Sequence, residues 1–205
     1  RDIKKAIHYF KESSSFNNPF SKNNLGIIYK RGLGEEIKPN VNDAVTYFDE
    51  AIRRGKSFLS MYNLASIYIY DEQYNCEEDY FNTSIKLLIE SITLNFEPSY
   101  NLLCIALIKK HGKNYIEMKK DIDDLAVDKN DIFSKLCRII DIFWLENLDR
   151  FNEFVEKNKN LDFLYDNNFQ PISFEEFSKR KYNPNQNVND NIPKINKDFY
   201  DGFGC

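Results

Sequence analysis

Side chains that could carry out acid–base or metal chemistry are few in this chain and lie far apart. Its 205 residues include two histidines, His8 and His111, either of which could serve as a metal ligand or a general base. Neither histidine has a cysteine or a pair of carboxylates at the spacing of a metal site, and His111 fits the end of a helix. We therefore expect structural or exposed positions for both histidines, and we predict no metal site.

Two other segments could support catalysis or cofactor binding. Asp121, Asp123 and Asp124 could form a hydrolytic carboxylate pair, although a solvated helix face explains the same cluster. The segment Gly32-Leu33-Gly34 has the glycines of a phosphate-binding loop, but it follows a predicted helix and has no Gly-Lys-Ser/Thr ending. The sequence also has no Gly-x-Ser-x-Gly motif and no kinase catalytic loop. We therefore predict a chain that is not an enzyme and that needs no cofactor.

The composition excludes two kinds of partner and one fold class. The formal net charge is -4 and no long run of like charge occurs, which argues against nucleic-acid binding. No run of about 18 apolar residues occurs, so we predict no membrane span. Only 7 glycines and 6 prolines are present, too few for an all-β domain with many tight turns. Helices must therefore position the functional side chains.

The cysteines and the first residue bear on the setting of the chain. Cys104 and Cys137 lie in apolar helical stretches, where a free cysteine behaves as a small hydrophobic residue. Cys76 and Cys205 form no close pair with them, so a reducing compartment and a cytoplasmic location are expected. The chain begins at Arg1 within a predicted helix, and we expect it to be a fragment of a longer protein.

An internal repeat organises the first half of the chain. Leu25, Leu64 and Leu102 recur at spacings of 39 and 38 residues, and each repeat contains two predicted helices. In the first helix of the second repeat, the apolar and small residues follow the period of an α-helix: Ala44, Tyr47, Phe48, Ala51 and Ile52. The pattern predicts an array of helical hairpins in which neighbouring helices approach closely.

Asparagine also recurs at one position of this repeat. The residue is abundant throughout the chain, and we attribute most of it to an AT-rich genome. Asn24, Asn63 and Asn101 are the exception, because each precedes the repeated leucine of a second helix.

The repeat decays after Gly112. Helices are still predicted over residues 116–126, 131–145 and 150–157, and Ser173 begins a capping box that indicates one more short helix. Residues 182–198 are rich in Asn and Pro and are expected to be extended or disordered. Three aromatic residues then follow, which either fold back onto the array or bind a partner: Phe199, Tyr200 and Phe203.

The first two repeats carry a recognisable motif. Asn24-Leu25-Gly26-Ile27-Ile28-Tyr29, the Gly32-Leu33-Gly34 loop and the Ala-x-x-Tyr-Phe-x-x-Ala helix over 44–51, which is followed by Gly55, resemble the SEL-like repeat of the tetratricopeptide superfamily. The match is clear over residues 1–68, weaker over 80–108, and fades beyond.

This resemblance implies an all-α fold, a right-handed α-solenoid of stacked antiparallel helix hairpins with degenerate C-terminal helices and an extended tail. The expected parts are SEL-like helical repeats over 1–112, a degenerate helical repeat or cap over 113–166, and a mostly irregular tail over 167–205.

SEL-like repeats are generally non-catalytic, so the resemblance implies a protein–protein interaction scaffold or adaptor. Two alternatives stay open. The chain could be a regulatory repeat module of a larger enzyme, such as a protein kinase. It could also be a luminal quality-control adaptor, for which Asn82-Thr83-Ser84 offers a glycosylation sequon.

In this superfamily the first helix of each hairpin usually lines a concave groove, and the resemblance therefore implies a groove for a protein or peptide there. The mixture of signs among the exposed residues indicates a polar groove with no dominant charge. These residues are Lys5, His8, Thr46, Asp49, Glu50, Arg53, Asn82, Lys86 and Glu90.

Overall fold

A computed structural model of the chain describes residues 3–15, 17–33, 37–74, 78–112, 114–125, 132, 134–137, 148–159, 161–166 and 170–179. This part of the chain is mostly helical, in agreement with the sequence pattern. The helices of the three expected repeats are α1 (Ile3–Ser15), α2 (Pro19–Arg31), α3 (Val41–Gly55), α4 (Phe58–Tyr70), α5 (Glu78–Thr93) and α6 (Pro98–His111).

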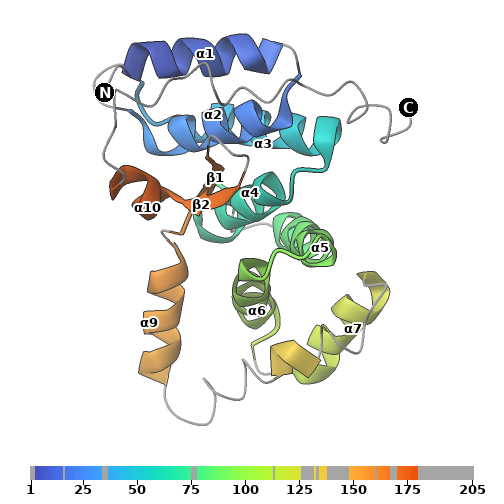
Figure 1. Cartoon of the computed structure of the whole chain (residues 1–205). Coiled ribbons are helices and arrows are strands. Elements are labelled where there is room, and N and C mark those ends of the chain that lie inside the picture. The colour runs from blue at the N-terminus through green and yellow to red at the C-terminus, as the bar shows by residue number, and fades with distance from the viewer. Residues whose placement is uncertain are drawn as a thin grey trace.

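Helices that follow one another in the sequence pack against one another from α1 to α7, as expected for helical hairpins (Figure 1). Side chains cap the N-termini of several of these helices. The Oδ1 atom of Asn18 accepts hydrogen bonds from the first backbone N–H groups of α2, and Asn40 and Ser57 cap α3 and α4 in the same way. Pro19 and Pro98 occupy the first turns of α2 and α6, where no N–H group is required.

Two glycines allow helices to approach closely. A Cβ atom on Gly26 would lie 2.5 Å from the ring of Phe48, so α2 and α3 could not sit this close with any larger residue. A Cβ atom on Gly55 would lie 2.5 Å from the ring of Pro19. Gly55 is the last residue of α3, and the left-handed conformation that ends this helix belongs to Lys56.

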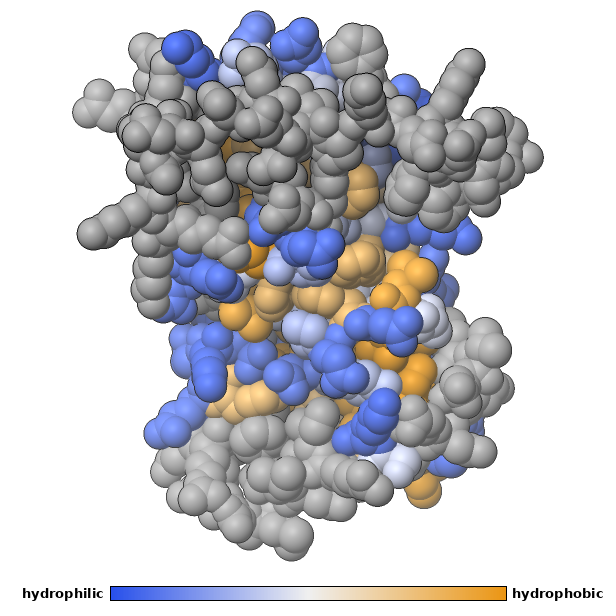
Figure 2. All heavy atoms as spheres, viewed as in Figure 1, coloured by the Kyte–Doolittle hydropathy of each residue, from blue (hydrophilic) through white to orange (hydrophobic). Residues whose placement is uncertain are grey.

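The core consists of two clusters of buried side chains. The larger cluster joins α4, α5, α6 and α7, with Leu88 and Met118 among its fully buried members. The smaller cluster joins α2, α3 and α4 around Phe48, the residue that the predicted stripe of the second repeat contains. On the face shown in Figure 2, apolar side chains gather across the middle of the molecule with hydrophilic side chains around them.

The C-terminal part of the described chain combines helices with one small sheet. Its elements are α7 (Tyr115–Leu125), α9 (Leu148–Lys159), β1 (Phe163–Tyr165), β2 (Pro171–Ser173) and α10 (Phe174–Lys179). The bounds of α7 and α9 match two of the predicted helices, and the Ser173 hydroxyl caps α10 by accepting a hydrogen bond from the Glu176 N–H. Phe154 and Val155 of α9 pack against the larger core cluster.

The sheet is a departure from the expectation of an all-helical chain. Strands β1 and β2 are antiparallel, with Leu164 opposite Ile172, and Figure 1 shows the hairpin beside α2 and α4. A three-residue strand carries too little periodicity to be read from sequence, and contacts with distant helices hold it in place. The expected boundary at residue 166 lies between these two paired strands.

Several predictions fall on residues outside the described ranges. These include most of the helix predicted over 131–145, the extended segment 182–198 and the aromatic residues Phe199, Tyr200 and Phe203. No helix in the described part of the chain is long and apolar enough to cross a membrane.

Candidate peptide-binding site

Strand β1 is held by asparagine side chains of α2 and α4. The Asn63 Nδ2 atom donates to the Phe163 carbonyl oxygen at 2.7 Å, and the Phe163 N–H donates to Asn63 Oδ1 at 3.1 Å. Two residues further along the strand, Asn24 forms the same pair of bonds with Tyr165, at 2.8 and 2.9 Å. Each amide thus satisfies both polar groups of one backbone residue, as a neighbouring strand would.

The two edges of β1 are paired with different partners. Residues 163 and 165 point their N–H and C=O groups toward the asparagines, because successive residues of a strand alternate. On the other edge, the Asp162 carbonyl oxygen accepts from the Phe174 N–H at 2.9 Å, and Asp166 pairs with Gln170. Strand β1 therefore lies between β2 and a row of asparagine amides that takes the place of a third strand.

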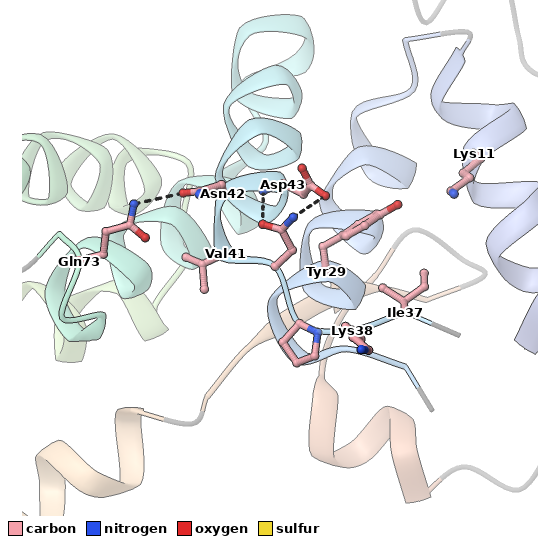
Figure 3. A pocket seen from close by; sticks show the side chains of 10 residues that line it. Lys11, Tyr29, Ile37, Lys38, Val41, Asn42, Asp43 and Gln73 are labelled. Atoms are coloured by element: carbon pink, nitrogen blue, oxygen red, sulfur yellow. Dashed lines mark hydrogen bonds between the residues drawn. The ribbon is translucent and has the colours of Figure 1, made fainter. Parts of the chain in front are cut away.

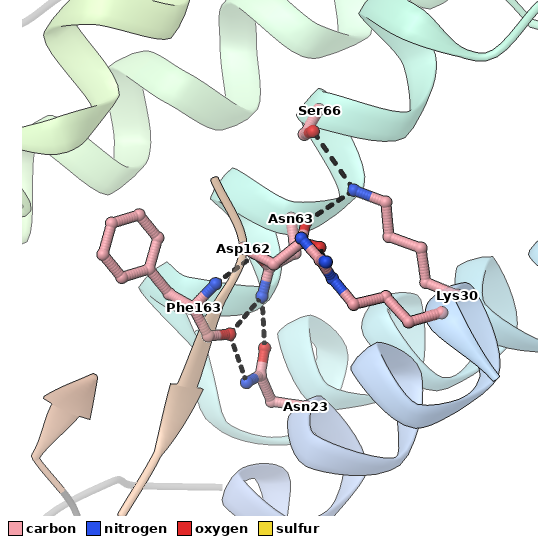
Figure 4. A network of polar contacts seen from close by, with 7 residues as sticks. Asn23, Lys30, Asn63, Ser66, Asp162 and Phe163 are labelled. Atoms are coloured by element: carbon pink, nitrogen blue, oxygen red, sulfur yellow. Dashed lines mark hydrogen bonds and ion pairs between the residues drawn. The ribbon is translucent and has the colours of Figure 1, made fainter. Parts of the chain in front are cut away.

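A third asparagine links the two amides into one network, which Figure 4 shows in part. Asn23 Oδ1 accepts from Asn63 Nδ2 at 3.0 Å and from the Ser60 hydroxyl at 2.9 Å, while Asn23 Nδ2 donates to the Phe163 carbonyl oxygen at 3.2 Å. Asn23, Ser60 and Asn63 have no exposed surface. These bonds restrict the rotation of the amides and hold them oriented toward the strand. We call Asn23, Asn24 and Asn63 the asparagine site.

A charged anchor precedes the strand. The Asp162 carboxylate is 2% exposed and forms ion pairs with Lys30 Nζ, at 2.6 Å, and with Arg31 Nε. Lys30 Nζ also donates to the Ser66 hydroxyl at 3.3 Å, and the Arg31 guanidinium lies 4.4 Å from the centre of the Phe174 ring. Two cations at the end of α2 therefore meet one buried carboxylate.

The side chains of β1 enter aromatic surroundings. The Phe163 ring makes edge contacts with Tyr62 and Phe96, at centroid distances of 5.1 and 5.0 Å. The Tyr165 ring makes edge contacts with Phe20 of α2 and Phe58 of α4. Its hydroxyl lies 3.3 Å from the Ser57 hydroxyl. Burial raises the pKa of Tyr165 to about 12, although the hydrogen bond with Ser57 works in the opposite direction.

The third repeated asparagine is not used. Asn101 lies in α6 at the position of Asn24 and Asn63, is half-buried, and has no hydrogen-bond partner among the described residues. The next residue in register on the strand would be Leu161, but its N–H donates to the Asn158 carbonyl oxygen at the end of α9. The chain beside α6 is therefore still part of the end of α9, and it becomes extended only where it reaches α4 and α2.

The residues predicted to bind a partner lie on a different set of helices. They are distributed over α1, α3 and α5: Lys5, His8, Thr46, Asp49, Glu50, Arg53, Lys86 and Glu90. All of them are exposed or half-exposed, and Asn82 is half-exposed as well. Strand β1 packs against α2 and α4 instead, so none of the predicted residues contributes to the asparagine site.

Several members of this set already have partners within the chain. Glu50 forms an ion pair with Lys22, whose side chain is only 7% exposed. Arg53 pairs with Asp49 at 2.7 Å, one helical turn away on an exposed face. Glu50 therefore has a structural task, because a buried lysine without a counter-ion is costly.

The residues considered for chemistry are placed as follows. His8 is exposed, whereas His111 Nε2 and Lys110 Nζ each lie 2.7 Å from the same oxygen of Asp121. Asp123 forms an ion pair with Lys119 on the same helix. Within the described residues no group of three His, Cys, Asp or Glu side chains could hold a metal ion. Cys104 is fully buried, and burial raises the pKa of its thiol to about 12.

A shallow pocket of about 570 Å³ lies beside the beginning of α3 (Figure 3). Its polar side chains largely bond to one another. Asn42 Oδ1 accepts from Gln73 Nε2 at 3.3 Å and from the Tyr74 hydroxyl at 2.9 Å, while Asn40 Nδ2 donates to Asp43 at 2.9 Å. These bonds hold the start of α3 and join it to the connection between α4 and α5, and we assign no ligand to the pocket.

Sequence reasoning set Asn24 and Asn63 apart as a recurring repeat position, but it predicted no binding role for them and missed the segment that they hold. The recurrence of Asn24 and Asn63 at one repeat position was the signal that set them apart from other asparagines. Asp162, Phe163 and Tyr165 lie roughly a hundred residues away from α4 and carry no repeat or motif, so no local pattern could have paired them with it.

Part of the chain is similar to a putative sel1-like repeat-containing protein, L21, of Acanthamoeba polyphaga mimivirus, with 31% identity over 96 residues. The match spans 47% of this chain but only 17% of the viral protein. No family model matches the chain, and no solved structure matches it. The likeness supports a relationship to SEL1-like repeats, in agreement with the motif over the first two repeats.

Proposed function

We propose that the chain is a non-enzymatic protein-interaction scaffold, a right-handed solenoid of SEL-like hairpins that holds extended polypeptide segments by their backbone. One observation carries the proposal. Asn24 and Asn63 each bind both polar groups of one backbone residue, two residues apart, on a segment distant in sequence. Such bonds are independent of the side chains of the bound segment, and scaffolds that accept different partners require this property.

A selection from a random peptide library against the full chain tests this function. We expect the selected peptides to bind the Asn24→Ala/Asn63→Ala chain at least tenfold more weakly than the wild-type chain. The Asn101→Ala chain is the matched control and should bind them as the wild type does. Circular dichroism shows whether each variant keeps its helices. The proposal is contradicted if none of the selected peptides binds the double variant more weakly than the wild-type chain.

The exposed residues of α1, α3 and α5 form a second proposed interaction surface. Its support is their exposure and their mixture of charges on consecutive first helices. The test is charge reversal at Arg53 and Lys86, because reversal at Glu50 would leave Lys22 without its counter-ion. A partner bound there should lose affinity with Arg53→Glu/Lys86→Glu and keep it with Asn24→Ala/Asn63→Ala.

A further inference from the structure

The contacts of β1 with α2 and α4 come from four consecutive residues, 162–165. The charged anchor is Asp162, the backbone bonds belong to Phe163 and Tyr165, and the two rings of these residues fill aromatic surroundings. Since four residues in a row make all these contacts with α2 and α4, any extended chain with the same four side chains can make them. The recognition is that of a short linear motif.

Charge complementarity determines the first position of this motif. Lys30 and Arg31 are 19% and 29% exposed, and both direct their charge at the Asp162 carboxylate. Each cation binds one oxygen of this single carboxylate, so both bonds depend on a negative charge at the first position. An acidic residue is therefore favoured there, and a basic residue is strongly disfavoured because a third cation would be buried beside two.

The following three positions are determined by packing. Phe163 lies among Tyr62 and Phe96, and Tyr165 lies beside Phe20 with its hydroxyl near Ser57. Leu164, between them, points the other way into the smaller core cluster and is 5% exposed. The alternation of a strand thus requires rings at the second and fourth positions and an aliphatic side chain at the third.

We propose that the asparagine site binds a partner protein through an extended segment of the pattern acidic–aromatic–aliphatic–aromatic, for which residues 162–165 of this chain are the internal stand-in. This inference rests on the proposed function and names the class of partner segment. When the partner binds, its segment replaces β1 on α2 and α4, and the same asparagine amides bind its second and fourth residues.

A synthetic peptide with the sequence of residues 159–168 tests the proposal against full-length chains. The receptor is the Asp162→Lys/Phe163→Ala chain, whose internal segment has lost its charged and aromatic anchors; the Asp162→Lys chain is a milder second receptor. By fluorescence anisotropy we expect the peptide to bind these receptors at least tenfold more tightly than it binds the wild-type chain. Circular dichroism confirms that both receptors remain helical.

Two altered peptides separate the inference from the proposed function. A peptide with lysine in place of Asp162 should bind at least tenfold more weakly, and a receptor that also carries Lys30→Glu/Arg31→Glu should reverse this preference. Equal binding of the two peptides would overturn the proposed pattern and leave backbone recognition intact. A peptide N-methylated at the residues equivalent to 163 and 165 should also lose binding, and equal binding of that peptide would overturn backbone recognition itself.

A second copy of this chain could also supply residues 162–165 to the site, and a measurement of molecular mass tests for this. Light scattering should give a monomeric mass for the wild-type chain at the concentrations used for binding. A dimer that the Phe163→Ala substitution abolishes would show that copies exchange residues 162–165 with each other, and this outcome would overturn the assignment of the site to a different partner.

Discussion

The same asparagine position behaves differently at the two ends of the helical array. In α2 and α4, Asn24 and Asn63 bind the backbone of β1, whereas Asn101 of α6 binds no described residue. The three residues occupy equivalent positions, so the difference does not arise from the helices. It arises from the chain opposite them, which is extended beside α2 and α4 and helical beside α6.

The end of α9 marks the change. Asn158 is buried and donates to the Phe154 carbonyl oxygen, and the Leu161 N–H donates to the Asn158 carbonyl oxygen. The second bond uses the Leu161 N–H, one of the two backbone groups that a third asparagine would need. A repeated amide can thus bind both polar groups of one backbone residue, and whether it does so depends on the conformation of the segment beside it.

Substitution of the used asparagines is the largest expected perturbation. Asn63→Ala removes both bonds to Phe163 and one to Asn23, and it leaves the partly buried N–H of Phe163 without its acceptor. We expect a loss of about 2–4 kcal/mol in the free energy of unfolding, measured by urea denaturation. Asn24→Ala should act in the same direction.

Asn101→Ala is the matched control, and its effect should stay within about 0.5 kcal/mol. If Asn101→Ala destabilised the chain as much as Asn63→Ala does, the contrast between the two ends of the array would be wrong.

The position after the repeated leucine also changes along the array, from Gly26 in α2 to Ala65 in α4 and Leu103 in α6. Gly26→Ala would drive a methyl group into the ring of Phe48, and we expect a loss of about 1–3 kcal/mol from this overpacking. The measurement is again urea denaturation. An exposed position of α5 provides the control, since Lys86→Ala should change little. A Gly26→Ala chain as stable as the wild type would mean that the close approach of α2 and α3 is unnecessary.

The other end of the array depends on charge and should respond to pH. Burial raises the pKa of Asp121, but hydrogen bonds from His111 and Lys110 outweigh it, and the pKa is lowered from 3.8. A lowered pKa means that this carboxylate stabilises the fold above about pH 4 and that the contribution is lost as the pH falls through the lowered value. Asp121→Asn should therefore flatten the acid side of the stability curve.

Urea midpoints between pH 2.5 and 6 provide the measurement. We expect the effect to be smaller than that of Gly26→Ala, because the site is partly exposed. Asp124→Asn, at an exposed position of the same helix, is the control. If the curve for Asp121→Asn coincided with the wild-type curve, the charge of Asp121 would not stabilise the contact between α6 and α7.

Sequence reasoning reached the helices because their signals are local and repeated. The stripe that contains Ala44, Phe48 and Ala51 predicts a buried face, and all three residues are fully buried. The capping box that begins at Ser173 likewise marked the start of α10. Each of these features depends on residues within a few turns of each other.

The occupant of the asparagine site could not be reached in this way. The bonds between Asn63 and Phe163 join residues 100 positions apart, and a three-residue strand has almost no periodicity to detect. The recurrence of asparagine at one repeat position set these residues apart from the general excess of asparagine, but nothing in the sequence indicated what they bind. Tertiary contacts created β1, and only the arrangement of α2 and α4 shows why Phe163 and Tyr165 alternate with Leu164.

The smallest expected effect concerns the residue before each repeated asparagine, which is Tyr62 in α4 and Tyr100 in α6. The Tyr62 hydroxyl is buried beside the ring of Phe163 and has no hydrogen-bond partner among the described residues, whereas every amide of the asparagine site is paired. Burial also raises the pKa of Tyr62 far above its usual range, so the hydroxyl remains neutral.

Tyr62→Phe removes an unsatisfied polar group and keeps the ring, and we expect a neutral effect on the free energy of unfolding or a gain of up to about 1 kcal/mol. Tyr100→Phe is the matched control and should be neutral. A clear loss with Tyr62→Phe would show that its hydroxyl contributes to the site that holds β1.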